Sequence, residues 1–145
     1  MVAPKPSPPK SREGCVLLVE HEPYARNTIR LALAQAGHKV LETGDGQEAV
    51  EVMRSGDRSR MVTAILVDIG LPRNSGVEAI AFFRLQYPSI PVVVLTGQRD
   101  CDLAITLMKM GVRDYVVKPV VKQDLLRVLA GAVQGDHTAR SQCVA

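Results

Sequence analysis

Polar side chains that could bind a metal ion and a phosphate group follow four short apolar runs in this sequence. Glu20 and His21 come directly after VLLV, Asp68 after AILV, Thr96 after VVVL, and Lys118 after YVV. Carboxylate oxygens are ligands that Mg²⁺ prefers, a lysine supplies a point charge for a phosphate, and a hydroxyl donates a hydrogen bond to it. A carboxylate can also be the nucleophile in phosphoryl transfer, which gives an acyl phosphate. These residue types therefore predict phosphoryl transfer to a carboxylate, provided that the fold brings the four positions together.

The apolar runs alternate with segments of helical periodicity five times along the chain. Runs that are apolar on both faces are typical of a parallel sheet covered by helices on both sides. The pattern predicts a doubly wound α/β fold, with a five-stranded parallel sheet in the order 2-1-3-4-5. The predicted strands are 15–19, 38–41, 62–67, 91–95 and 114–117, and the predicted helices are 24–36, 46–55, 76–86, 99–110 and 122–133.

One domain is predicted over residues 14–134. It lies between a disordered tail at 1–13, which holds four prolines and no apolar cluster, and a short flexible tail at 135–145. In this domain the first and third strands are neighbours at the point where the strand order reverses and a crevice opens. Asp68 is then the best nucleophile, because it is central and flanked by Glu20 on one side and Lys118 on the other. Any one of these residues could be an ordinary polar residue at a strand end, but four at consecutive strand ends argue against that interpretation.

The composition argues against nucleic-acid and membrane proteins. The net charge is +3, there is no Trp, and the chain has two Phe and three Tyr. It therefore has neither a basic field nor an aromatic platform for nucleic acid, and no apolar stretch approaches the roughly 20 residues of a membrane span. Three widely separated cysteines, Cys15, Cys101 and Cys143, indicate reduced thiols in a cytoplasmic protein.

A second motif competes for the function. The sequence GDGQEA at 44–49 fits the G-x-G-x-x-A pattern of dinucleotide-binding loops. Against this interpretation, Asp45 would place a carboxylate against the pyrophosphate, and the chain leaves no second half to hold a substrate. The dinucleotide hypothesis also leaves Lys118, Thr96 and Glu20 without a role.

Four motifs, in order, resemble those of the receiver domains of two-component response regulators. They are VLLVEHEP, LVDIGLPRNSG, VVVLTG and DYVVKP, and the resemblance runs over residues 15–133, nearly the whole globular part. It implies a flavodoxin-like fold and a cytoplasmic signalling domain rather than an enzyme, although such a domain assists its own phosphorylation and dephosphorylation.

The resemblance also implies roles for individual residues. Asp68 would accept a phosphoryl group from a histidine kinase or a phosphotransfer protein, and Thr96 and Lys118 would hold it. Tyr115 would move between exposed and buried positions as the switch. The family tends to have a cis peptide at the position of the bond between Lys118 and Pro119.

The metal site is where the sequence departs from the family. The resemblance implies Mg²⁺ bound by Glu20, Asp68 and the backbone carbonyl of Gly70, but His21 stands where the family usually has a second acid. Imidazole suits Zn, Cu, Fe or Ni better than Mg, and brings no negative charge. We therefore expect weak Mg²⁺ binding, with Mn²⁺ or another divalent metal as an alternative, and a receiver-like module that no longer depends on phosphate as the alternative function. Glu22 is expected to face solvent at the start of a helix, where a negative charge suits the dipole.

A partner surface is expected on helix 99–110, strand 114–117 and helix 122–133. The first of these helices has a wider apolar arc than one sheet contact needs, which indicates either deep burial or a docking surface. In the resembled family this face carries contacts to a downstream protein or to a second copy of the chain. Charge substitutions should weaken such association at whichever of Leu107, Met108 and Met110 are exposed.

Overall fold

The computed structural model describes residues 14–57, 59–97 and 101–134, so that the predicted tails at 1–13 and 135–145 lie outside the described residues. Five parallel strands form one sheet in the order β2-β1-β3-β4-β5, which confirms the predicted topology. The strands are β1 (Cys15–Val19), β2 (Lys39–Thr43), β3 (Val62–Asp68), β4 (Val92–Thr96) and β5 (Asp114–Val117). The helices are α1 (Pro23–Gln35), α2 (Gly46–Arg54), the short 3₁₀ turn η2 (Pro72–Asn74), α3 (Ser75–Gln86), α4 (Cys101–Lys109) and α5 (Lys122–Val133).

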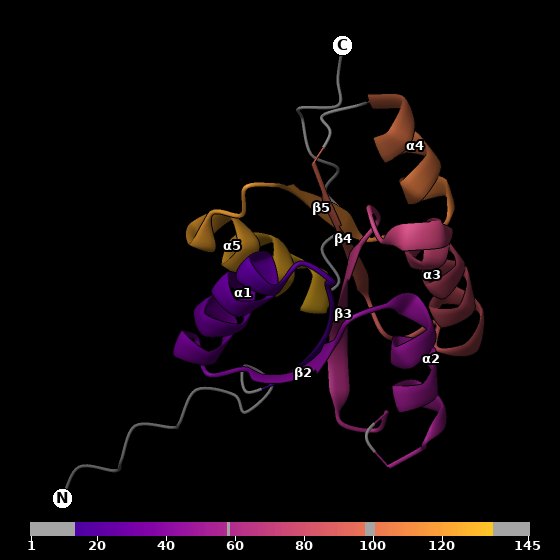
Figure 1. Cartoon of the computed structure of the whole chain (residues 1–145), viewed down its shortest axis with the longest axis horizontal. Helices are drawn as coiled ribbons and strands as arrows, with labels where there is room; N and C mark the ends of the chain where they lie inside the picture. The colour runs from indigo at the N-terminus through magenta and orange to yellow at the C-terminus, as the bar shows by residue number, and fades with distance from the viewer. Residues whose placement is uncertain (1–13, 58, 98–100, 135–145) are drawn as a thin grey trace, which may run out of the picture.

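Helices cover both faces of the sheet. Figure 1 shows α1 and α5 on one face and α2, α3 and α4 on the other. Leu17 and Val19 of β1 belong to the core beneath the second group, whereas Val16 and Leu18 belong to the core beneath α1 and α5. This alternation follows from the period of two in a strand. It explains why β1, β3 and β4 read as continuous apolar runs: both of their faces are buried.

The observed elements differ from the predicted ones chiefly at their ends. β3 includes Asp68 and β4 includes Thr96, because the parallel pairing continues to Asp68 opposite Leu95 and to Thr96 opposite Val117. The turn η2 was not predicted. It contains Arg73 at φ 60°, a left-handed conformation that sequence periodicity does not reveal.

The apolar arc of α4 is divided between core and surface. Leu107 is buried, Met108 and Met110 are half-buried, and Ile105 is 48% exposed. Deep burial therefore accounts for Leu107, and Ile105 is an exposed apolar residue of this helix. Among the described residues, no helix combines the length and apolar character needed to cross a membrane.

Candidate functional site

Strand register brings Glu20 and Asp68 side by side. Val19 of β1 pairs with Val67 of β3, so the next residues along the two strands, Glu20 and Asp68, lie together at the carboxyl edge of the sheet. On the other side of β3, Thr96 at the end of β4 pairs with Val117. The backbone N–H of Lys118 then donates to the carbonyl of Thr96 at 2.7 Å. The four predicted strand-end residues therefore converge at one edge.

Lys118 links the two acids. Its Nζ lies 3.0 Å from Asp68 Oδ2 and also contacts Glu20 Oε1. The Glu20 side chain is fully buried, Asp68 is 4% exposed, and Lys118 is half-buried. The peptide bond between Lys118 and Pro119 is cis, as the resemblance implied. The sequence analysis assigned Lys118 to a phosphate and missed its ion pair with Glu20.

Backbone donors hold the carboxylates from the other side. The N–H of Gly70 donates to Asp68 Oδ1 at 2.8 Å, and the N–H of Glu22 donates to Glu20 Oε2 at 3.2 Å. Both oxygens of Asp68 are thus in polar contact. The role of the Gly70 carbonyl as a metal ligand remains a prediction.

The two buried acids have pKa values that move in opposite directions. Burial raises the pKa of Glu20, because a charged carboxylate loses solvation, and Lys118 offsets only part of this. Burial also acts to raise the pKa of Asp68, but its neighbours outweigh it and lower the pKa: Glu20 beside it, the N–H of Gly70 and the ammonium of Lys118. For Lys118, burial acts to lower the pKa, but the two carboxylates raise it. The arrangement thus keeps Asp68 ionised and Lys118 charged at neutral pH.

His21 faces the acids from the loop after β1. Its Nδ1 lies 3.7 Å from Glu20 Oε2 and 3.9 Å from Asp68 Oδ2, and its side chain is 46% exposed. One ligand atom from each of these three residues lies within 4.8 Å of the others, a spacing from which a metal ion could be held. The two carboxylates fit Mg²⁺, whereas the imidazole does not fit a hard cation that prefers oxygen.

The predicted phosphoryl-binding residue Thr96 and the predicted switch residue Tyr115 are both buried. Thr96 is 3% exposed at the end of β4, and Tyr115 is 7% exposed in the core beneath α2, α3 and α4. After Thr96, a Cβ built on Gly97 would meet nothing within 4 Å, so the space beside the strand end is open. The roles of Thr96 and Tyr115 in phosphoryl binding and switching remain predictions.

Glu22 caps helix α1. It is exposed, and its carboxylate accepts hydrogen bonds from the N–H groups of Tyr24 at 3.0 Å and Ala25 at 2.6 Å. These bonds lower the pKa of Glu22. Such a cap satisfies two free N–H groups of the first turn. Glu22 therefore stabilises the start of α1, whereas Glu20 and His21 face the site.

The GDGQEA motif begins helix α2 and has a packing role. The Asp45 side chain accepts from the N–H of Glu48 at 2.7 Å, so a carboxylate already caps the helix where a pyrophosphate would bind. A Cβ on Gly46 would lie 2.2 Å from the carbonyl oxygen of Ser75, which shows that the glycine permits close packing of α2 on α3.

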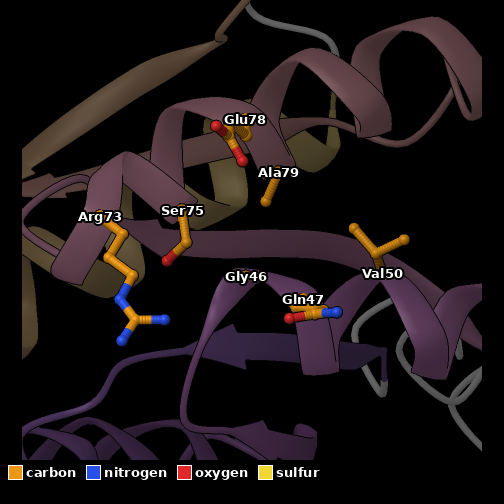
Figure 2. Close-up of a pocket in the computed structure, with 7 residues that line it drawn as sticks. All are labelled: Gly46, Gln47, Val50, Arg73, Ser75, Glu78 and Ala79. Atoms are coloured by element: carbon orange, nitrogen blue, oxygen red, sulfur yellow. The ribbon is translucent and has the colours of Figure 1, made fainter.

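A pocket of about 430 Å³ opens between α2 and α3. Figure 2 shows Gly46 and Gln47 on one side and Ser75, Glu78 and Arg73 on the other. None of the residues that line it belongs to the cluster of Glu20, His21, Asp68 and Lys118.

Comparison with known proteins agrees with the fold. The family model described as response regulator receiver domain matches residues 16–130. The cell cycle transcriptional regulator CtrA of Caulobacter vibrioides is 29% identical over 82% of this chain and 50% of its own length. The transcriptional regulatory protein PhoP of Escherichia coli O157:H7 is 26% identical over 89% of this chain and 56% of its own length. This chain thus spans about half the length of these relatives.

A solved structure has the same architecture. The crystal structure of a response regulator receiver domain protein from Clostridium thermocellum superposes with a TM-score of 0.77 at 26% identity, and the alignment covers 84% of this chain and 95% of that chain.

Proposed function

Since this chain belongs to the response regulator receiver domain family, we propose that it is a phosphorylation-dependent switch in which Asp68 accepts the phosphoryl group. The observation that carries the proposal is the contact of one ammonium group, Lys118 Nζ, with both Asp68 and the buried Glu20. This contact places a fixed positive charge beside an ionised carboxylate at the edge where ligands of doubly wound sheets bind.

The proposed reaction transfers a phosphoryl group from a phosphohistidine of a histidine kinase or phosphotransfer protein. An oxygen of Asp68 attacks phosphorus, the P–N bond breaks, and the histidine nitrogen leaves with the electron pair and takes a proton. The product is an acyl phosphate on Asp68. Lys118 and the hydroxyl of Thr96 would bind the phosphoryl oxygens, and Tyr115 would respond as the switch.

A divalent metal ion would be held by Glu20, Asp68 and the carbonyl of Gly70. When bound, such an ion neutralises charge that develops on the phosphoryl oxygens. The carboxylates of Glu20 and Asp68 suit this role, and both already lie against a cation, the ammonium of Lys118. The family usually uses Mg²⁺, and His21 weakens the case for that ion in this chain.

Signalling would proceed by protein contact through the face formed by α4, β5 and α5. Ile105 of α4 is exposed on this element, and Val121 directly before α5 is 60% exposed. The partner would be a downstream protein or a second copy of this chain, in the cytoplasm. The relatives CtrA and PhoP are named as transcriptional regulators.

A second candidate function is a receiver-like interaction module that does not depend on phosphate. Two features favour it: His21 stands where the resemblance to the family implies an acid, and Lys118 already pairs with both carboxylates. In this alternative the ion pairs are permanent, and the α4-β5-α5 face acts constitutively.

Incubation with acetyl phosphate and a divalent cation, read by intact mass, separates the two functions. We expect one phosphate adduct on the wild type in the presence of Mg²⁺ or Mn²⁺, and none on Asp68→Asn. Asp57→Asn is the matched control, because Asp57 is an exposed residue of the turn between α2 and β3, and it should keep the adduct. No adduct on the wild type with either cation would reject the switch and favour the interaction module.

A further inference from the structure

We propose that the metal site of this chain selects a first-row divalent transition ion over Mg²⁺, with the imidazole of His21 as a direct ligand beside the carboxylates of Glu20 and Asp68. The inference rests on the proposed function for the location of the site, and adds to it the chemical class of the ion. It is carried by the direction of the His21 ring, the charge of the cluster and the cation that already occupies it.

The ring of His21 presents a nitrogen to the acids. Nδ1 lies 3.7 Å from Glu20 Oε2 and 3.9 Å from Asp68 Oδ2. Ligand atoms at right angles around an ion at 2.0–2.1 Å are separated by about 3.0 Å, so a movement of roughly 1 Å brings Nδ1 to ligation distance from both carboxylate oxygens. The side chain is 46% exposed in the loop after β1, and rotation of this half-solvated ring can supply that movement.

The charge of the cluster is low for a Mg²⁺ site. With Glu20 and Asp68 both ionised and His21 neutral, two carboxylates against the ammonium of Lys118 leave one net negative charge. An acid at position 21 would make this two. Because Mg²⁺ binds hard oxygen ligands and dehydrates reluctantly, a missing carboxylate removes part of what holds it. A transition ion loses the same charge but gains a bond to an imidazole nitrogen, a ligand that Mg²⁺ does not favour.

A cation already lies between the acids. Lys118 Nζ contacts Glu20 Oε1 and lies 3.0 Å from Asp68 Oδ2. The ammonium shows that the buried pair accommodates a positive charge at this position, and an incoming ion must compete with it. The oxygens that face His21 Nδ1 are Glu20 Oε2, which is not the oxygen that contacts Lys118, and Asp68 Oδ2, which Lys118 also contacts. An ion bound on that side gains the nitrogen ligand and competes with Lys118 for Asp68 Oδ2, but it leaves the contact of Lys118 with Glu20 Oε1 in place.

The test is a titration of the phosphate-free protein with Mg²⁺, Mn²⁺ and Co²⁺, one at a time, for the wild type, His21→Asp, His21→Ala and the matched control His38→Ala. His38 precedes β2 and is no part of the cluster. The preference for Co²⁺ and Mn²⁺ over Mg²⁺ is expressed as a ratio of dissociation constants. We expect this ratio to be about tenfold larger in the wild type and in His38→Ala than in either His21 variant. A tenfold effect is the order that loss of a single group supporting a metal typically has. We also expect His21→Asp to bind Mg²⁺ more tightly than the wild type.

A spectroscopic readout identifies the ligand itself. With Mn²⁺ bound, electron spin echo modulation should show a coupled imidazole nitrogen in the wild type and in His38→Ala, and none in His21→Ala. An unchanged ion preference in the His21 variants, an absent nitrogen coupling, or no binding of any of the three ions would each overturn the inference. The mass measurement separates this result from the switch: an adduct formed without any ion preference leaves the switch standing and removes the inference. An ion preference that depends on His21, without a phosphate adduct, leaves the inference standing and rejects the switch.

Discussion

At the scale of single residues, one ammonium group contacts two buried carboxylates. Lys118 contacts Glu20 and Asp68 at positions where neither acid is open to solvent. An unpaired charge in such a place costs several kcal/mol, whereas a paired one costs far less. Lys118 is therefore a structural residue of the resting protein as well as a candidate ligand of the phosphoryl group.

The pKa shifts fix the pH range over which these contacts stabilise the fold. The pKa of Asp68 is lowered, so its stabilisation is present above the ordinary pKa of an aspartate and is lost as the pH falls through the lowered value. The pKa of Lys118 is raised, so its stabilisation is present at neutral pH and is lost only as the pH rises past the raised value. The pKa of Glu20 is raised, so this residue favours folding when protonated, and that contribution is lost as the pH rises.

We predict that Lys118→Met destabilises the protein by about 2 kcal/mol at pH 7, because it leaves two buried carboxylates without a cation. Near pH 4 the loss should be smaller, since the raised pKa of Glu20 then allows that residue to be protonated. Urea unfolding at both pH values measures the difference. Lys122→Met is the control, because the Lys122 ammonium donates to exposed Gln35 rather than to a buried acid, and it should change stability little at either pH. Equal losses at pH 4 and pH 7 for Lys118→Met would contradict the account.

At the scale of elements, Gly76 sets how closely α3 approaches the strand that carries Asp68, and Gly46 sets how closely α2 approaches α3. A Cβ on Gly76 would lie 2.5 Å from the carbonyl oxygen of Asp68, and one on Gly46 would lie 2.2 Å from that of Ser75. In both cases the nearest atom belongs to the backbone, which cannot move away as the end of a long, flexible side chain can. The start of α3 therefore packs against the end of β3, and α2 packs against the start of α3.

Gly46→Ala should destabilise the protein by about 1–3 kcal/mol, because the added methyl group forces α2 away from α3. Thermal and urea unfolding measure this loss. Gly44→Ala is a close control, since a Cβ there would meet its nearest atom, a nitrogen of the Arg26 side chain, at 3.5 Å. If the two variants were equally stable, close packing would not be the reason for the glycine in the GDGQEA motif.

At the scale of the whole molecule, the helical layer formed by α2, α3 and α4 carries two exposed apolar residues. On the side of α2, α3 and α4, Leu85 of α3 is 77% exposed and Ile105 of α4 is 48% exposed. Only the second belongs to the proposed α4-β5-α5 face. Ile105 therefore lies inside the expected contact surface, and Leu85, in the same layer, lies outside it.

We predict that Ile105→Asp weakens self-association or binding of a downstream partner at least tenfold, because a charge would be buried in an apolar contact. Sedimentation velocity of the wild type and the variant, with and without acetyl phosphate, measures self-association. Leu85→Asp is the control and should leave association unchanged. If Leu85→Asp weakened association and Ile105→Asp did not, the contact surface would lie elsewhere.

The sequence by itself determined the order of the elements and the residues at their ends. Apolar runs on both faces indicated buried parallel strands, and the placement of Glu20, Asp68, Thr96 and Lys118 at strand ends follows from periodicity alone. The strand order then sufficed to bring these residues to one edge, because parallel strands share a carboxyl end. The predicted ends of β3 and β4 differ by one residue from the observed ends, since these depend on strand pairing, and the turn η2 was not predicted, since it depends on a single left-handed residue, Arg73.

Only the tertiary structure decided which atoms meet. Lys118 and Glu20 are far apart in the chain, so no local pattern reveals that their side chains form an ion pair. The direction of the His21 ring depends on the loop after β1 and on the acids beside it. The role of Gly46 depends on the distance between two helices, a quantity that side-chain packing sets. Sequence periodicity places residues on elements, but distances between elements follow from the packing of side chains that are remote in sequence.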